Sequence, residues 1–349
     1  MLRRFRGVTG ALLLVALLLP GTASAATEGF NIVTSPLPIK LGAQPGQTVV
    51  TELRMKNQGD QPEGIKVGLM KFGATGEDGT PTIADLTSKD TYGSWVTFSP
   101  SQFTAEPGVW ETVKMTINIP SSASLGYYLA VTFSRANQPG ESGQANLKGA
   151  VATLVLLEVK TPNEQRQVKL VDFSSVHKLY EYLPANFTVR VHNSGNIYIA
   201  PTGNIFIQRG NTSISTIDFN DAGGSVLPGT NRTFTVPWNS GFPVFKDRLV
   251  HGQPVKDGHG QNEQNLSWDF GQLSKFRFGH YTAKLLLVYD NGTTDVPLEA
   301  SVGFWVIPWK LLLLALLILA VVGYGVWSLI RNLFKGTKSG VQKYRHGKK

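Results

Sequence analysis

The sequence contains no cysteine among its 349 residues. This absence excludes disulfide bonds, thiol catalysis and thiolate-bound zinc. The folded state must therefore be stabilised by burial of apolar side chains. Residues 26 to 306 are numerous enough for two domains of about 140 residues, each able to bury most of its apolar surface.

The motifs of common enzyme classes are missing as well. The sequence has no Gly-x-Ser-x-Gly elbow, no Gly-x-x-x-x-Gly-Lys loop and no His-Glu-x-x-His pair. The best remaining group of titratable side chains lies between residues 247 and 269, where Asp257, His259 and Glu263 are candidate ligands of a divalent cation. Their spacing fits neither an EF-hand nor a zinc pattern, which favours a solvated loop. We therefore expect no catalytic residue, no metal and no cofactor.

Acidic residues are missing from the C-terminal end of the chain. None follows Glu299, and residues 311 to 330 carry no charged side chain of either sign. Because such a run spans about 30 Å as a helix, the hydrocarbon thickness of a bilayer, we predict a transmembrane helix within residues 307 to 330. The basic tail, residues 331 to 349, indicates that this end lies in the cytoplasm. The residues expected to anchor the helix at the membrane surfaces are Trp309, Lys310, Trp327, Arg331 and Lys335.

The N-terminal end indicates export. Three arginines precede the apolar run Ala11–Leu19, and the small-residue pattern Ala23-Ser24-Ala25 follows it. This order is typical of a secretory signal peptide, which we place at residues 1 to 25. Of the 33 basic residues, three lie in this peptide and eight lie from Lys310 onward, which leaves 22 against 24 acidic residues in the exported part. The high net charge therefore reflects topology, and nucleic-acid binding loses its main support.

Between these ends the chain lacks long amphipathic helices. Residues 51 to 56 and 113 to 119 alternate apolar and polar side chains, a pattern typical of half-buried strands, and turn residues recur about every ten positions. The run Val151–Val159 is apolar on both faces and predicts an interior strand. We predict an all-β fold of two tandem immunoglobulin-like β-sandwich domains, residues 26 to 161 and 162 to 306, followed by the single transmembrane helix.

The second half of the exported part repeats landmarks of the first half in the same order. Leu53–Asp60 corresponds to Val189–Asn196, a strand that runs into a turn for which we expect left-handed backbone at Asn or Gly. These matches indicate an internal duplication, although common strand-and-turn chemistry also produces such matches by coincidence. The copies differ by an insertion at residues 238 to 278, which is rich in aromatic residues. Loops of this length are usually functional or mobile.

Aromatic side chains are the candidate binding residues. Trp268, Phe270 and Phe245 belong to the insertion, and one member of the pair Tyr127–Tyr128 should point outward, which makes Tyr128 the fourth candidate. Aromatic rings stack on sugars and anchor protein interfaces. The alternative is that aromatics such as Tyr127 are buried in a sandwich core.

A set of short motifs, in this order, resembles the WxL-interacting surface proteins of Gram-positive bacteria. In the first half they are Ser35-Pro36-Leu37, Pro45-Gly46-Gln47, Asn57-Gln58-Gly59-Asp60, Trp95–Pro100, Glu106-Pro107-Gly108 and Gly126-Tyr127-Tyr128. In the second half they are Asn193-Ser194-Gly195-Asn196, Pro201–Gly203, Val226–Gly229 and Gly279–Tyr281. The resemblance implies a membrane-anchored surface protein that is associated with peptidoglycan and with proteins carrying paired Trp-x-Leu motifs. The long insertion departs from that family's pattern.

These observations favour a non-catalytic, single-pass protein of the cytoplasmic membrane whose exported domains bind cell-wall glycan or another envelope protein. The alternative is a chaperone-like assembly factor that presents a sheet edge to exported surface proteins. A metal-dependent hydrolase seated in the insertion is the third and least supported hypothesis.

Overall fold

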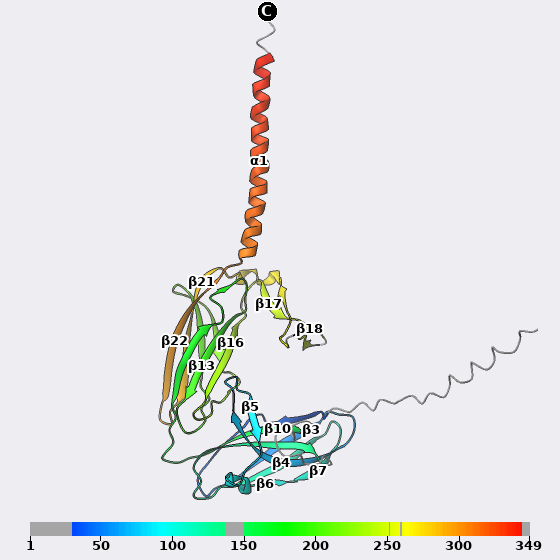
Figure 1. Cartoon of the computed structure of the whole chain (residues 1–349), viewed down its shortest axis with the longest axis vertical. Coiled ribbons are helices and arrows are strands. Elements are labelled where there is room, and N and C mark those ends of the chain that lie inside the picture. The colour runs from blue at the N-terminus through cyan, green and yellow to red at the C-terminus, as the bar shows by residue number, and fades with distance from the viewer. Residues whose placement is uncertain (1–29, 137–149, 251, 259, 344–349) are drawn as a thin grey trace, which may run out of the picture.

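The computed structural model describes residues 30–136, 150–250, 252–258 and 260–343, with side chains up to residue 332. The predicted signal peptide lies outside these residues. In the described part, the strands form two β-sandwiches that share no sheet, and one long helix follows them (Figure 1). The predicted all-β sandwich architecture is confirmed.

The N-terminal sandwich comprises residues 32–159. Its elements are β1 Ile32–Ser35, β2 Ile39–Ala43, β3 Thr48–Asn57, β4 Glu63–Ala74, β5 Pro81–Ala84, the 3-10 helix η1 Thr91–Trp95, β6 Val96–Ser99, β7 Gln102–Ala105, β8 Trp110–Asn118, β9 Leu125–Arg135 and β10 Ala150–Val159. One sheet has the order β1-β3-β8-β6, and the other has the order β2-β10-β9-β4-β5, with β7 paired to β4. Side chains such as Leu53, Met115 and Phe133 fill the space between the sheets and are completely buried.

The C-terminal sandwich comprises residues 168–306. Its strands are β11 Val168–Ser175, β12 Leu179–Tyr180, β13 Ala185–Asn193, β14 Thr202–Arg209, β15 Thr212–Phe219, β16 Asn231–Trp238, β21 Gly279–Asp290 and β22 Asp295–Val306. They form sheets of order β11-β13-β16 and β12-β22-β21-β14-β15 around a separate core that contains Phe187, Trp238 and Phe304. The insertion folds as β17 Val244–Asp247, β18 Leu249–Val250, β19 Gln253–Pro254, β20 Gln264–Ser267 and the 3-10 helix η3 Phe270–Lys275, with β17 paired to β20 and β18 to β19.

The burial patterns explain why the period of two predicted the strands. In β13 every second side chain from Ala185 to Asn193 is buried, because successive side chains of a strand point to opposite faces. The apolar strand β10 differs, since every residue from Val155 to Val159 is buried. Here β9 covers one edge and β2 covers the other. Of the outward-facing residues, Leu156 lies near residues 222–232 of the C-terminal sandwich, and Glu158 pairs with Arg166 of the linker.

The two matched turns share a buried asparagine at the end of a strand. Asn57 ends β3 and donates to the carbonyls of Gln61 at 2.7 Å and Ala105 at 3.1 Å, while its side-chain oxygen accepts from the backbone of Gly59. Asn193 ends β13 and makes the equivalent contacts, donating to two carbonyls at 2.7 and 2.9 Å and accepting from Gly195 N. The expected left-handed backbone in these turns is wrong, because neither the asparagines nor the glycines have a positive φ. In both turns, hydrogen bonds from the buried asparagine side chain hold the backbone in place of a left-handed residue.

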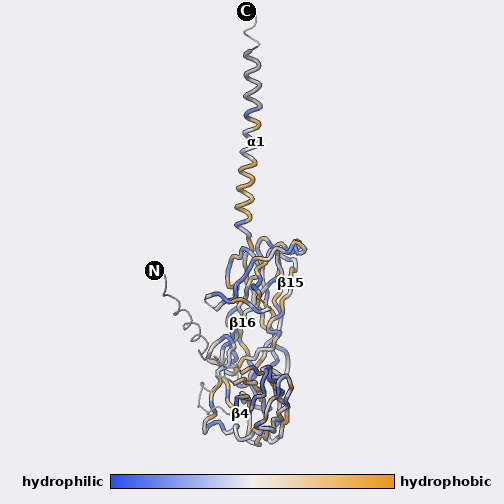
Figure 2. Tube along the Cα trace, turned by 90° about the vertical axis from the view of Figure 1, so that its right-hand side faces the viewer, coloured by the Kyte–Doolittle hydropathy of each residue, from blue (hydrophilic) through white to orange (hydrophobic). Residues whose placement is uncertain are grey.

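The C-terminal helix α1 extends over Trp309–Lys343. It begins after Pro308, whose carbonyl accepts from Leu312 N, and it continues beyond the predicted end at residue 330. Its stretch Trp309–Asn332 is long and apolar enough to cross a membrane, and none of that stretch is buried against protein. Figure 2 shows this apolar segment extending away from the sandwiches.

The arrangement of the elements places the insertion close to the helix. In Figure 1, α1 leaves the end of the C-terminal sandwich at which the yellow segment with β17 and β18 also lies. The N-terminal sandwich lies at the opposite end. A membrane that contains α1 would therefore face the insertion.

Candidate binding site

A cleft lies between the two sandwiches and encloses a cavity of about 300 Å³. Four separate parts of the chain line it: the β1–β2 connection, the β4–β5 hairpin, the outward face of β10, and residues 222–232, which lead from β15 into the start of β16. We call this the inter-sandwich cleft. Its lining comprises Leu37, Pro38, Phe72, Gly73, Ala74, Gly76, Gly79, Thr80, Pro81, Leu154, Leu156, Ala222, Gly223, Gly224, Ser225, Val226, Leu227, Thr230, Asn231 and Arg232.

The lining is mostly apolar and has one cation. Leu154 and Leu156 point from the same face of β10, and Phe72 comes from β4, which is separated from β10 by β9. Ligand pockets in proteins commonly combine such an apolar wall with a few polar groups that fix orientation. In this cleft, the polar lining residues are Thr80, Ser225, Thr230, Asn231 and Arg232.

The guanidinium of Arg232 is held closely by its surroundings. Its Nη1 donates to Ser225 O at 2.7 Å, and its charged carbon lies 4.9 Å from the centre of the Phe234 ring. A Cβ at Gly79 would collide with the guanidinium, and the φ of +83° at Gly79 further favours glycine there. Burial lowers the pKa of Arg232. Its Nε and the hydroxyl of Ser225 are buried and have no hydrogen-bond partner among the described residues.

Glu77, at the tip of the β4–β5 hairpin, joins the two sandwiches beside the cleft. Its carboxylate accepts from Arg190 Nε and Nη2, both at 2.6 Å, from Asn231 Nδ2 at 3.0 Å and from Thr233 Oγ1 at 3.2 Å. The backbone N–H of Thr233 also donates to Glu77 O at 2.6 Å. Hydrogen bonds from Arg190 and Asn231 lower the pKa of Glu77 from 4.5 to about 2. The hairpin that forms one wall of the cleft is thereby fixed to β13 and β16.

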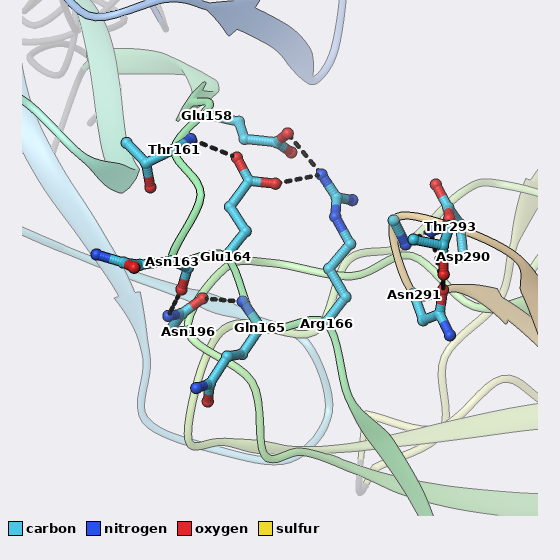
Figure 3. Close-up of polar contacts among 11 residues, drawn as sticks. Glu158, Thr161, Asn163, Glu164, Gln165, Arg166, Asn196, Asp290, Asn291 and Thr293 are labelled. Carbon is cyan, nitrogen blue, oxygen red and sulfur yellow. Dashed lines mark hydrogen bonds and ion pairs between the residues drawn. The ribbon is translucent and has the colours of Figure 1, made fainter.

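The linker between the sandwiches is also fixed by polar contacts (Figure 3). Arg166 Nη2 lies 2.5 Å from Glu158 Oε1, close to the end of β10. Asn196, from the turn after β13, accepts from Gln165 N at 2.8 Å and donates to Asn163 O at 2.9 Å. These contacts restrict the conformation of the linker, so the two sandwiches, and with them the walls of the cleft, are held in a defined arrangement.

Several solved structures with similar strands are chaperones. The class 5 fimbriae chaperone CfaA is 12% identical over 80% of this chain and 100% of its own, with a TM-score of 0.33. The CupB2 chaperone of Pseudomonas aeruginosa is 8% identical over 78% of this chain and 100% of its own, with a TM-score of 0.33, and the E. coli chaperone DraB is 10% identical over 78% and 96%, with a TM-score of 0.31. No protein-family model and no curated protein matches the sequence. Likenesses at this identity and TM-score carry no information about function.

The four predicted binding residues do not form one site. Trp268 and Phe245 lie together in the insertion, where both rings contact Tyr182, at centroid distances of 6.4 and 6.1 Å, and Phe270 lies 6.4 Å from Trp268. Tyr128 lies far from them, on the outward face of β9. Its ring contacts Phe72 at 5.9 Å and, from the C-terminal sandwich, Tyr198 at 6.4 Å. Burial raises the pKa of Tyr128. It therefore belongs to the contact between the sandwiches.

The candidate metal ligands have other partners. Glu263 Oε2 pairs with Arg248 Nη1 at 2.9 Å, and Asp257 Oδ1 accepts from Gln261 N at 2.9 Å. His259 lies outside the described residues, as does His251. Within the part of the chain that the structure describes, no group of three or more His, Cys, Asp or Glu side chains could hold a metal ion.

The predicted membrane anchors lie along α1. Lys310 Nζ pairs with Glu181 Oε2 at 2.8 Å and lies 5.3 Å from the centre of the Trp309 ring. Near the other end, the guanidinium of Arg331 lies 5.4 Å from the centre of the Trp327 ring. Lys335 is in the helix, but its side chain lies outside the described part.

The inter-sandwich cleft leaves no pattern in the sequence that predicts it. Its residues lie at positions 37–38, 72–81, 154–156 and 222–232, and no local pattern connects these segments. One feature of the sequence did indicate a buried surface at this place. The run that forms β10 is apolar on both faces, so its outward face had to be covered as well as the face in the core. Glu77 and Arg232 had no sequence signal at all.

Proposed function

We propose that the chain is a membrane-anchored protein that binds an extended segment of another exported protein in the inter-sandwich cleft. The observation that carries this proposal is the cavity of about 300 Å³, which has apolar walls on two sandwiches and the cationic Arg232 in its lining. An apolar side chain of a partner fits such a cavity, and a backbone carbonyl or carboxylate of the same segment would accept from Arg232.

The chemistry of the cleft supports a polypeptide more strongly than a glycan. Sugar rings are recognised by aromatic platforms together with many polar side chains, whereas the cleft lining includes one aromatic ring, Phe72. Leucine, proline, valine and alanine supply nine of the other lining residues, and five more are glycines. Between the two partners considered from the sequence, cell-wall glycan and an envelope protein, we favour the protein.

A partly open strand edge lies beside the cleft. Along its whole length β10 pairs with β9, but β2 pairs only with Val155–Val159. Among the described residues, no strand pairs with that other edge over Ala150–Leu154, and Leu154 also lines the cleft. A partner strand added at this edge would gain backbone hydrogen bonds while its side chains enter the cavity.

The position of the protein in the cell is part of the proposal. The signal peptide at residues 1 to 25, export of the sandwiches and a cytoplasmic basic tail together give a single-pass protein of the cytoplasmic membrane. A surface protein with paired Trp-x-Leu motifs, or a protein bound to peptidoglycan, is a partner of the kind implied by the family resemblance. The protein acts by binding, without catalysis or a cofactor.

A chaperone-like role is the second candidate, because an open edge beside an apolar cavity can also hold an exported subunit before it is assembled. The two roles differ in lifetime. A permanent partner stays bound in the mature envelope, whereas a chaperone substrate is bound only while new subunits are being exported.

The test is site-specific photo-crosslinking of the full-length protein in its own membrane. A photoreactive amino acid at Leu154 should form an adduct with a discrete polypeptide, and the same group at Lys114, exposed on the opposite sheet, should not. Leu154→Asp should weaken the interaction, since it places a charge in an apolar wall. Irradiation at increasing chase times after a labelling pulse separates the two roles. A permanent partner still forms the adduct late in the chase, whereas a chaperone substrate forms it only early. Equal adducts at both positions, or an adduct with glycan at Leu154, would contradict the proposal.

A further inference from the structure

A patch of exposed apolar side chains lies in the insertion, separate from the inter-sandwich cleft. Phe270 is 71% exposed and Leu273 is 59% exposed, and Trp268, Phe276 and Phe278 are each more than 40% exposed. We call these five residues the aromatic patch. Soluble proteins rarely expose so many large apolar side chains together on their surface unless that surface is a binding site.

The patch is held in a defined structure. Phe242 is buried and contacts the rings of Trp268 at 5.8 Å and Phe270 at 5.6 Å, and its backbone N–H donates to Lys275 O. Asp269 caps η3 by accepting from Gly271 N. Phe242 thus supports two rings of the patch from inside the protein, while the five patch side chains remain exposed.

A short chain of contacts connects the patch to the start of the membrane helix. Lys310, the second residue of α1, pairs with Glu181. The next residue, Tyr182, contacts the rings of Trp268 and Phe245. Figure 1 shows the same relation at lower detail, with the yellow insertion beside the base of α1. The patch therefore lies close to the level at which the helix enters the bilayer.

The composition of the patch fits the surface region of a bilayer. Tryptophan and phenylalanine favour the membrane–water interface, and exposed basic side chains beside them favour anionic lipid headgroups. Lys275 is exposed at the end of η3 between Leu273 and Phe276. The only acidic side chain in residues 268 to 278 is Asp269, which is engaged as the η3 cap.

We propose that the aromatic patch inserts into the outer surface of the same bilayer that α1 crosses. The chain is then attached to the membrane at two places, the helix and the insertion. A single flexible attachment would let the sandwiches adopt many angles to the membrane plane. A second attachment beside the first restricts this angle and keeps the inter-sandwich cleft at a fixed distance from the membrane. Because α1 already holds the patch at the surface, even a weak intrinsic affinity for lipid is sufficient.

The absence of cysteine allows a direct test in the full-length protein. Single variants Phe270→Cys and Leu273→Cys carry an environment-sensitive fluorophore, and Ser121→Cys, exposed in the N-terminal sandwich, is the matched control. Each protein is reconstituted into vesicles of phosphatidylcholine and phosphatidylglycerol that contain a lipid with a nitroxide near its headgroup. We expect several-fold stronger quenching by the nitroxide lipid at positions 270 and 273 than at 121, and the reverse order for aqueous iodide.

Two results would overturn the proposal. If iodide reaches positions 270 and 273 as readily as position 121, the patch lies in water. If both labels are protected from iodide but are not quenched by the nitroxide lipid, the patch is covered by protein. The readout does not involve the partner of the cleft, so a negative result would contradict the membrane contact of the patch and leave the proposed function unaffected.

Discussion

Glu77 has an unusually strong set of donors for a half-buried carboxylate. Its oxygens accept from Arg190, Asn231 and Thr233, all on the other sandwich. These donors stabilise the charged form, which is why its pKa falls from 4.5 to about 2. A carboxyl group whose pKa is lowered by folding contributes stability above its unfolded pKa, and this contribution is lost as the pH falls through the folded pKa. The contact between the sandwiches should therefore weaken between about pH 4.5 and about pH 2.

We predict that Glu77→Gln lowers the melting temperature at neutral pH and that the difference from the wild type shrinks as the pH falls from 4.5 to about 2. Glutamine keeps the shape of the side chain but loses its charge. The measurement is a pH series of thermal unfolding on the full-length protein in detergent micelles. Asp90, whose pKa is lowered by a hydrogen bond from Lys71, titrates equally in both proteins and cancels from the comparison. A difference that stays constant over this range would contradict the prediction.

The matched asparagines give a second prediction at this scale. Asn193 is fully buried and donates to the carbonyls of Ile197 and Val226. Val226 O also accepts from Ile199 N, so Asn193→Ala leaves the buried Ile197 carbonyl without this donor and Gly195 N without its acceptor. We expect a loss of about 1–3 kcal/mol in the free energy of unfolding, measured by denaturant titration. Asn204→Ala is the control, because its contact with Asp218 is exposed and should change stability by less than about 0.5 kcal/mol. Equal effects of the two variants would show that Asn193 does not support the turn.

At the scale of single elements, the sequence predicted those strands whose pattern reports burial on one face. The alternation in β3, β8 and β13 was sufficient to assign them, because each has one face in a core and the other toward water. The turns after β3 and β13 were correctly matched, but their mechanism was not, since a buried amide and a left-handed backbone leave the same Asn and Gly in the sequence. The cleft was not predictable, because its four segments meet only once both sandwiches have folded and docked.

The helix α1 was predictable because an uncharged apolar run of bilayer length is rare outside membrane-spanning helices. We predict that Leu319→Arg combined with Val322→Arg prevents membrane integration. The two arginines near the centre of the span add roughly 6 kcal/mol to the insertion free energy. The measurement is carbonate extraction of membranes that contain the variant, with Leu319→Ile as the control that keeps an apolar side chain. A variant that stays in the carbonate-resistant membranes would contradict the assignment of Trp309–Asn332 as the span.

At the scale of the whole molecule, the relation between the sandwiches decides whether a cleft exists. Three contacts fix this relation. Glu77 binds to β13 and β16, Lys40 Nζ donates to Gly223 O at 3.0 Å, and Arg166 in the linker pairs with Glu158. They lie on different sides of the junction, at the β4–β5 hairpin, on β2 and at the end of β10. The loss of one contact should loosen the junction, and the loss of two should allow the sandwiches to move relative to each other while each keeps its own core.

We predict that the double variant Glu77→Gln, Lys40→Met broadens the distribution of distances between the sandwiches. Spin labels on Ser121→Cys and Ser213→Cys, one exposed site on each sandwich, report this distance in the full-length protein, and each is unique because the chain has no other cysteine. Lys114→Met, a charge removed from the opposite sheet of the N-terminal sandwich, is the control and should leave the distribution unchanged. The broadening requires that both cores stay folded, so circular dichroism of the double variant must still match the wild type. A narrow, unchanged distribution would mean that the linker alone sets the geometry, and the cleft would then exist independently of Glu77 and Lys40.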